Sequence, residues 1–263
     1  MIVAMKNLKD QLDFGAGTRS HSQDSRIVCT REQKTLDWLI FVDSRGLGRP
    51  ENSDPQTSFL FHLMAQFERD KQSVMMVSRP LYLTIFPSLV YFLKQNRDYQ
   101  FNNLITNLGF VDTTPKKKAV LEDVAKQLTS LDLKSNLERL EKYQLSDGKT
   151  EILSTSPYSS EAIQTFSQTL KSFRRAFFIN TPTIDPNRVF ERKRPACFYS
   201  QIEVGNQLTA KICDGAEGQL VDISNQGIKT FDGVHYTEED HKQMTEQVNR
   251  GLRLHPPNAN LPS

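Results

Sequence analysis

The stretch "LDWLIFVD" at residues 36–43 decides the fold, because its apolar residues follow one another almost without a break. A strand with one face in water alternates apolar and polar residues, whereas a strand buried on both faces is apolar throughout. The run therefore predicts a strand of a parallel sheet. Four more short apolar runs have the same character and predict four more strands: "SVMMVS" (73–78), "NLITNLG" (103–109), "RAFFIN" (175–180) and "QLVDIS" (219–224).

Helical patterns lie between these runs. The first, "DPQTSFLFHLMAQFERD" (54–70), opens with Asp54 as N-cap and Pro55 at the first helical position, and then carries Leu63 and Phe67 on one face. Further helices are predicted over 87–95, 114–143 with a break near Leu131, 159–175, 200–213 and 236–252. Strands that alternate with helices form right-handed crossover units. We therefore expect a three-layer α/β/α sandwich around a mainly parallel, five-stranded sheet.

The composition fits one globular domain. The chain has 263 residues, of which 37% are hydrophobic and 24% charged. A net charge of +2, from 33 basic and 31 acidic residues, does not favour a nucleic-acid partner. No apolar run reaches the ~18 residues of a membrane span, and the start lacks the pattern of a secretory signal. We expect a cytoplasmic protein with a polar N-terminal arm (1–33), one domain (34–254) and a short tail (255–263).

The three cysteines, Cys29, Cys197 and Cys213, lie far apart without C-x-x-C spacing. This pattern argues against a disulfide framework or a zinc site, so buried thiols are the expectation.

Polar residues of chemical interest follow the predicted strands. Asp43 and Ser44 come after the first strand, Asn107 belongs to the third, and "TFDGVHYTEEDHKQM" (230–244) follows the fifth. Within that last stretch, Thr237 and Asp240 form a capping box, so a helix begins just after His235. His235 then lies in a loop with Asp232 close enough to orient its ring. Ligands of parallel sheets bind beyond the carboxyl ends of the strands, where all of these residues are expected.

Together these residue types can perform nucleophilic catalysis. A serine hydroxyl becomes a nucleophile when a histidine accepts its proton and a carboxylate holds that histidine in the correct tautomer. Ser44, His235 and Asp232 can fill these roles. Asn107 can donate a hydrogen bond to the oxyanion of the tetrahedral intermediate, as can the backbone N–H of Ser44. Asn107 could instead cap backbone groups at the strand end. His241 lies inside the last helix and is expected to be packed or half-exposed.

At this point the sequence resembles the SGNH hydrolases, also called GDSL-type esterases. "FVDSRG" (41–46) looks like their first block, "TNLG" (106–109) like the block with the oxyanion-hole Asn, and "DGVHYTEEDH" (232–241) like their closing Asp-x-x-His block. The resemblance covers about residues 36–252. It implies a flavodoxin-like sandwich with Ser44 as nucleophile, His235 as base and Asp232 as its partner. It also implies an oxyanion hole made by Asn107 and the Ser44 amide, and no metal or organic cofactor.

Two positions depart from the family pattern. Val42 stands where the first block usually has Gly before Asp-Ser, and "VSRPLYLTIFPS" (77–88) lacks the Gly whose amide completes the oxyanion hole. A backbone amide near Leu83 or Thr84 could replace it.

A basic run, "TTPKKK" (113–118), places Lys116, Lys117 and Lys118 in the first turn of the predicted helix, where the helix dipole disfavours positive charge. Either the run is a solvated surface, or it binds an anionic group of the substrate. Because the predicted helix follows the strand that holds Asn107, its start is expected on the rim of the active site, and "RVFERKR" (188–194) could add to that rim.

The resulting expectation is a serine esterase that cleaves an acyl ester of a small molecule or a sugar, with an anionic group on the substrate if the lysines bind it. An O-acyltransferase would use the same acyl-enzyme, and a binding module without catalysis could be built on the same sheet.

Overall fold

The computed structural model describes residues 26–29, 33–43, 59–79, 85–107, 113, 116–117, 122, 125–126, 128–133, 141–144, 151–154, 158–182, 196–224 and 237–254. Its strands are β1 (Arg26–Cys29), β2 (Thr35–Asp43), β3 (Val74–Arg79), β4 (Gln100–Thr106), β5 (Lys116–Lys117), β6 (Glu141–Gln144), β7 (Glu151–Ser154), β8 (Arg175–Ile179) and β9 (Gln219–Val221). Its helices are α2 (Phe59–Arg69), α3 (Ile85–Gln95), α6 (Ser160–Leu170), α7 (Ala196–Gly215) and α8 (Glu238–Leu254).

The main sheet has the strand order β1-β3-β2-β4-β8-β9. β3, β2, β4, β8 and β9 are parallel to one another. These are the five strands that the apolar runs predict, so that prediction is confirmed. A sixth strand, β1, pairs antiparallel with β3 at the edge.

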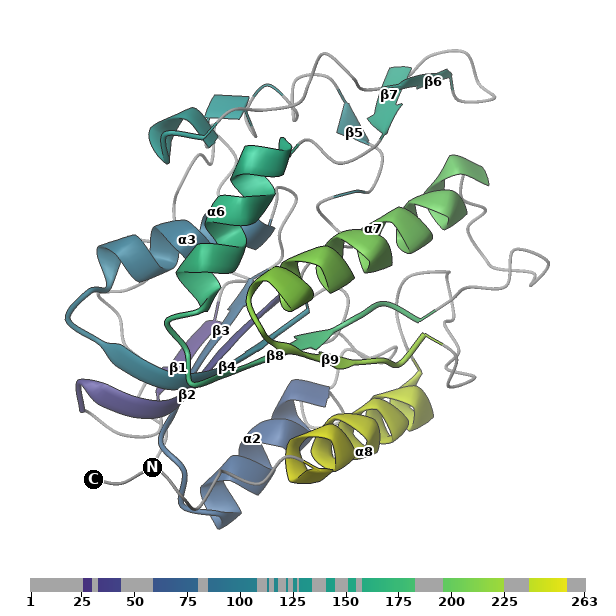
Figure 1. Ribbon diagram of the computed structural model, residues 1–263. Helices are drawn as coiled ribbons and strands as arrows, with labels where there is room; N and C mark the ends of the chain where they lie inside the picture. The colour runs from purple at the N-terminus through teal and green to yellow at the C-terminus, as the bar shows by residue number, and fades with distance from the viewer. Residues whose placement is uncertain are drawn as a thin grey trace.

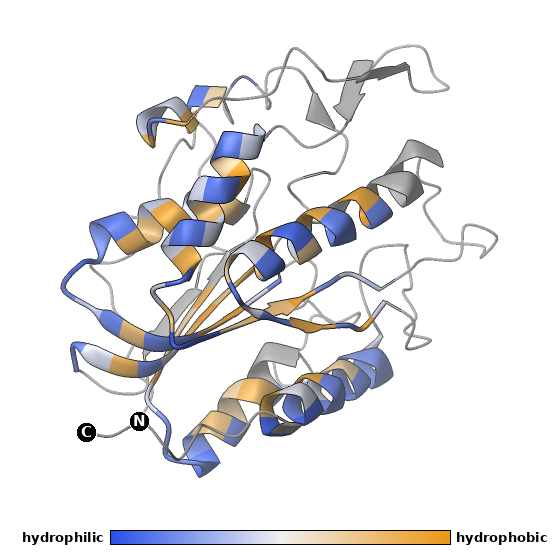
Figure 2. Ribbon diagram, in the orientation of Figure 1, coloured by the Kyte–Doolittle hydropathy of each residue, from blue (hydrophilic) through white to orange (hydrophobic). Residues whose placement is uncertain are grey.

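Helices cover both faces of this sheet, as Figure 1 shows: α3, α6 and α7 lie on one face, and α2 and α8 on the other. Each face has its own apolar core. Phe41, Phe166 and Phe178 belong to the core under α3, α6 and α7, whereas Ile40 and Met244 belong to the core under α2 and α8. In Figure 2 the strands are largely hydrophobic and the helices are hydrophilic on their outer sides. The three-layer α/β/α sandwich is confirmed.

Two predicted helix starts agree with the structure. Ser159 is the N-cap of α6, where its hydroxyl accepts a hydrogen bond from the backbone N–H of Ala162 at 3.1 Å. At α8, the backbone N–H of Asp240 donates to the hydroxyl of Thr237 at 3.3 Å, and that hydroxyl donates to the Asp240 carboxylate. These bonds satisfy groups that a bare helix end would leave without partners.

The segment 1–33, expected to be a polar arm, contains a strand. β1 spans only four residues, "RIVC", which is too short for its pattern to stand out in the sequence. Its pairing extends from Arg26 opposite Ser78 to Cys29 opposite Met75. Pairing with β3, and not local propensity, therefore decides the structure of these four residues.

The long helix predicted over 114–143 is wrong at both ends. Lys116 and Lys117 form β5, and Glu141–Gln144 form β6, with β7 between them in a second, three-stranded sheet of order β5-β7-β6. Residues 128–130 between these strands are helical. Pairing with the short β7 overrides the helical pattern of the sequence, as tertiary context often does.

The thiol prediction is confirmed for Cys213, whose side chain is 2% exposed. Burial, with a smaller contribution from the neighbouring Asp214 carboxylate, raises its pKa to about 12, so the thiol stays protonated. Among the helices that the structure describes, none is long and apolar enough to cross a membrane.

Candidate active site at the carboxyl edge of the sheet

The order of the parallel strands defines one switch point in the sheet. From β2 the chain passes to β3 on one side, whereas from β4 it passes to β8 and β9 on the other side. In parallel strands alone this order is 2-1-3-4-5, and its switch point lies between β2 and β4. Ligands of such sheets bind outside the carboxyl ends of the strands at the switch point. The carboxyl edge between β2 and β4 is therefore the first place to look for a site.

β2 and β4 are held together at this edge. Phe41 lies opposite Thr106 in the parallel ladder, and the Thr106 hydroxyl donates a hydrogen bond of 2.7 Å to the Phe41 carbonyl oxygen. Both residues have no exposed surface. Asn107 follows Thr106 directly and is half-buried, and β2 ends two residues after Phe41, at Asp43. Neighbouring strands lie ~4.8 Å apart, so the ends of β2 and β4 are close together.

β8 and β9 are joined at the same edge by a second set of polar bonds. The Asn180 side chain accepts a hydrogen bond from the backbone N–H of Ile223 at 2.7 Å and donates one to Oδ1 of Asp222, also at 2.7 Å. Oδ1 of Asp222 also accepts the backbone N–H of Ser224 at 2.9 Å and its hydroxyl at 2.6 Å. The hydrogen bond from the Ser224 hydroxyl is the main reason that the pKa of Asp222 lies below its ordinary value.

The end of β8 is also tied to α7. Asn206 accepts a hydrogen bond from the backbone N–H of Thr181 at 2.8 Å and donates one to the Thr181 carbonyl at 2.9 Å. One side chain therefore satisfies both backbone polar groups of Thr181, just beyond the strand.

α8 begins at this edge because a helix that follows a parallel strand returns along the sheet. Its residues Met244 and Val248 are fully buried against the face covered by α2, and Leu252 is half-buried beside them. His241 is fully buried in the same helix, which agrees with the packed alternative of the prediction.

Of the predicted catalytic and oxyanion-hole residues, the structure describes one. Asn107 lies directly after β4, at the edge where it is predicted. Ser44, Asp232 and His235 lie outside the described residues, as do Leu83, Thr84 and Lys118. Ser44 is nevertheless the next residue after Asp43, which ends β2 and lies opposite Arg79 of β3.

The lysine prediction loses its physical basis. Lys116 and Lys117 lie in β5, opposite Leu153 and Ile152 of β7, and not in the first turn of a helix. The unfavourable placement against a helix dipole, from which an anion site was inferred, therefore does not occur for these two residues.

Sequence reasoning missed Thr106, Asn180, Asn206 and Asp222. A signal for Asn180 was present, because "RAFFIN" ends in an Asn after an apolar run just as "LITN" does at Asn107. Asp222 and Ser224 also have the spacing of a turn in which an Asp side chain accepts the N–H two residues on. Thr106 and Asn206 carry no such signal. Among the described residues, no group of three His, Cys, Asp or Glu side chains is placed to hold a metal ion.

Comparison with solved structures identifies the fold. The chain superposes on the lipase/acylhydrolase from Enterococcus faecalis with a TM-score of 0.50 and 10% identity, over 87% of this chain and 100% of that one. It superposes on a protein from Parabacteroides merdae, assigned as a GDSL-like lipase, with a TM-score of 0.50 and 12% identity, over 84% and 97%. The chain has the SGNH-hydrolase fold. No family model matches the sequence, and no curated protein does.

The SGNH-hydrolase fold agrees with the sandwich and the strand order described above.

Proposed function

We propose that the protein is a serine-dependent ester hydrolase that acts through an acyl-enzyme. One observation carries the proposal: β2 and β4 meet at the switch point of the sheet, Ser44 follows the first and Asn107 the second. In this proposal, two residues that lie far apart in the sequence follow the ends of neighbouring strands. A nucleophile and an oxyanion-hole donor must lie close together. A serine that only forms a solvent-exposed turn needs no such neighbour.

In the proposed reaction, the Ser44 hydroxyl oxygen attacks the ester carbonyl carbon while His235 accepts the hydroxyl proton. The C–O bond of the ester then breaks, and His235 returns the proton to the leaving alcohol. Water attacks the acyl-enzyme in the same manner, and the carboxylic acid leaves as Ser44 regains its proton. Asp232 holds the imidazole in the tautomer that can accept a proton and stabilises the imidazolium.

The negative charge that develops on the carbonyl oxygen is stabilised by Asn107 and by the backbone N–H of Ser44. Each donor of this kind typically contributes ~10²–10³ in rate. Such donors are effective only when they are fixed in place beforehand. The Thr106 hydroxyl, which ties β4 to β2 one residue before Asn107, supports this role. The substrate is proposed to be an acyl ester of a small molecule or a sugar, and the chemistry needs no cofactor.

Labelling with a fluorophosphonate tests the proposal, because this probe phosphonylates activated serines. We expect wild-type protein to be labelled at Ser44 and to hydrolyse p-nitrophenyl acetate, and we expect Ser44→Ala to lose both. Ser172→Ala is the matched control: Ser172 is exposed after α6 and its hydroxyl donates only to the Thr169 carbonyl. If folded Ser44→Ala is still labelled and hydrolyses the ester at the wild-type rate, the proposal is wrong.

A further inference from the structure

We propose that Thr106 is a positioning residue, whose hydroxyl fixes Asn107, the proposed oxyanion-hole donor, relative to β2. This inference rests on the proposed function, because it concerns one donor of the proposed oxyanion hole. It depends on three residues at the switch point, Phe41, Thr106 and Asn107, all of which belong to the described part of the chain.

The ladders on the two sides of β2 end at different levels. The ladder between β2 and β4 ends where Phe41 lies opposite Thr106, and the ladder between β4 and β8 ends at the same Thr106. On its other side, β2 continues beside β3 through Val42 and Asp43. Asn107 is therefore the first residue beyond both ladders of β4, and its position depends on how Thr106 is held.

The Thr106 side chain adds a bond at this last pair of the ladder. Its hydroxyl donates to the Phe41 carbonyl oxygen at 2.7 Å, and both residues are 0% exposed. Removing the hydroxyl would take a donor away from a carbonyl that water does not reach, which is costly. The bond thus holds β4 against β2 one residue before Asn107, at the point where the two strands stop pairing.

Thr106 can transmit this restraint to Asn107 because the two residues share a peptide unit. A threonine side chain is branched at Cβ, so its χ1 has few rotamers, and the bond to Phe41 selects one of them. The orientation of the Thr106 backbone is thereby fixed, and with it the start of Asn107. An oxyanion-hole donor is effective only when it is fixed before the reaction. Misplacing a catalytic group by ~1 Å can cost ~10²-fold in rate.

A purely structural role is the competing explanation, and the chain offers a matched control for it. Thr245 of α8 is also buried, at 7% exposed, and its hydroxyl donates to the His241 carbonyl oxygen at 2.8 Å. Thr245→Val therefore removes the same kind of bond from a buried threonine. That bond lies within one helix, whereas the bond of Thr106 joins two strands beside the proposed donor.

The experiment measures kcat and KM on p-nitrophenyl acetate for variants of the full chain, corrected for the folded fraction. Asn107→Ala should lower kcat by ~10²–10³. Thr106→Val should lower kcat by about tenfold with KM unchanged, less than a full displacement would cost, because the main-chain ladder still holds the strand. Thr106→Ser keeps the hydroxyl, so this variant and Thr245→Val should both stay within about twofold of wild type.

A double variant tests whether Thr106 acts through Asn107. Once Asn107 is replaced by Ala, there is no side-chain donor left to misplace. Thr106→Val combined with Asn107→Ala should therefore be no slower than Asn107→Ala alone. A residue that only stabilises the fold would lower kcat by the same factor in both backgrounds.

The outcomes separate this inference from the proposed function. If Thr106→Val lowers kcat equally in both backgrounds, or no more than Thr245→Val does, the inference is overturned. If wild-type protein hydrolyses no ester, the proposed function fails instead, and the backbone order parameter of the Asn107 N–H, from ¹⁵N relaxation, then decides. A value of about 0.85, that of a rigid backbone, in wild type and Thr106→Ser but a lower value in Thr106→Val supports the positioning of Asn107. An unchanged value in Thr106→Val refutes it.

Discussion

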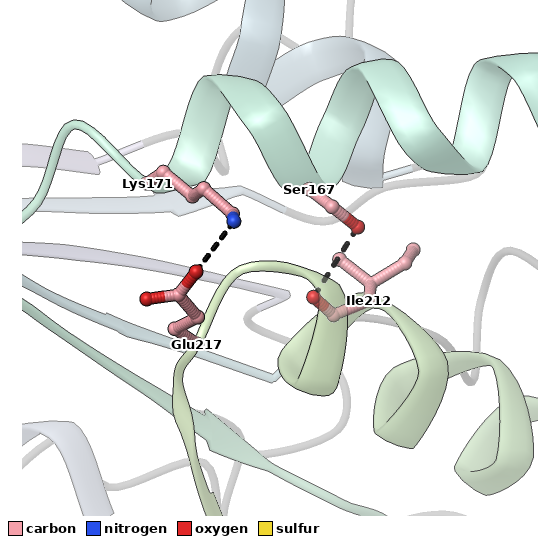
Figure 3. A network of polar contacts seen from close by, with 4 residues as sticks. All are labelled: Ser167, Lys171, Ile212 and Glu217. Atoms are coloured by element: carbon pink, nitrogen blue, oxygen red, sulfur yellow. Dashed lines mark hydrogen bonds and ion pairs between the residues drawn. The ribbon is translucent and has the colours of Figure 1, made fainter.

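The contact between α6 and α7 makes a quantitative prediction for Gly215→Ala. A Cβ atom at Gly215, the last residue of α7, would lie 2.6 Å from Oγ and 2.9 Å from Cβ of Ser167 in α6. Ordinary contacts of a Cβ atom begin near 3.4 Å. Ser167 cannot move aside easily, since it is 4% exposed and its hydroxyl donates to the carbonyls of Ile163 at 3.0 Å and Ile212 at 3.4 Å. Figure 3 shows the bond to Ile212 at the point where the two helices meet.

The expected cost follows from two opposing effects. Inserting a methyl group into a close contact typically costs ~1–3 kcal/mol, because the helices must shift apart. Replacing Gly by Ala in a helix returns up to ~1 kcal/mol, and less at its last residue. We therefore expect the free energy of unfolding to fall by about 1–2 kcal/mol, seen as a lower urea midpoint with an unchanged slope.

Ser167→Gly combined with Gly215→Ala is the control for this prediction. It removes both atoms that the new methyl group would meet, so the two substitutions together should be less destabilising than the sum of the single ones. The exposed ion pair beside them, between Lys171 Nζ and Glu217 at 2.6 Å, should contribute little, as surface pairs usually do. If Gly215→Ala is as stable as wild type or more stable, the reasoning from this contact is wrong.

Two further predictions concern the carboxyl edge. Thr106→Val keeps the shape of the side chain but removes the hydrogen bond to the Phe41 carbonyl. It should lower the free energy of unfolding, measured in urea, by about 1–2 kcal/mol, and it should slow fluorophosphonate labelling. A labelling rate equal to that of wild type would show that this bond does not position the site. The pKa of Asp222 is lower in the folded protein than its ordinary value of 3.8, so its stabilising contribution is complete above that value and is lost as the pH falls through the folded pKa. Asp222→Asn lacks this titration, so the stability difference between wild type and Asp222→Asn should shrink on acidification from about pH 5 to about pH 3; a constant difference would contradict the assignment.

The sheet was predictable from the sequence because a strand that is buried on both faces consists mainly of apolar residues. Four of the five parallel strands contain a run of apolar residues such as "LDWLIFVD", whereas β9 is a short strand with Leu220 exposed. The start of α8 was predictable for a similar reason, since Thr237 and Asp240 satisfy the helix end through bonds within three residues. In both cases the deciding interactions are local or depend only on burial.

The second sheet and β1 were not predictable, because their pairing is not local. β5 has two residues and its partner in β7 lies more than thirty positions away. The two residues "KK" carry no sequence signal for pairing with β7. The surrounding "TTPKKKAVLEDVAKQL" has the periodicity of a helix and the Pro of a helix start. The strand order was not predictable for the same reason. Five apolar runs predict a parallel sheet, but the switch point between β2 and β4 depends on the side of the sheet on which each later strand pairs, and that pairing is not local.

Three asparagines show why a polar residue in an apolar strand does not by itself mark a site. Asn103, Asn107 and Asn180 all stand in or directly after apolar runs, so the apolar pattern alone does not distinguish them. Asn103 joins strands toward their amino ends, and Asn180 joins β8 to the residues after β9. Asn107 alone stands at the carboxyl end of a strand that borders the switch point. Strand order therefore distinguishes the position of Asn107 from the positions of Asn103 and Asn180. The reasoning needs no match of a family motif, which is valuable here because identity to the two superposed structures is 10% and 12%.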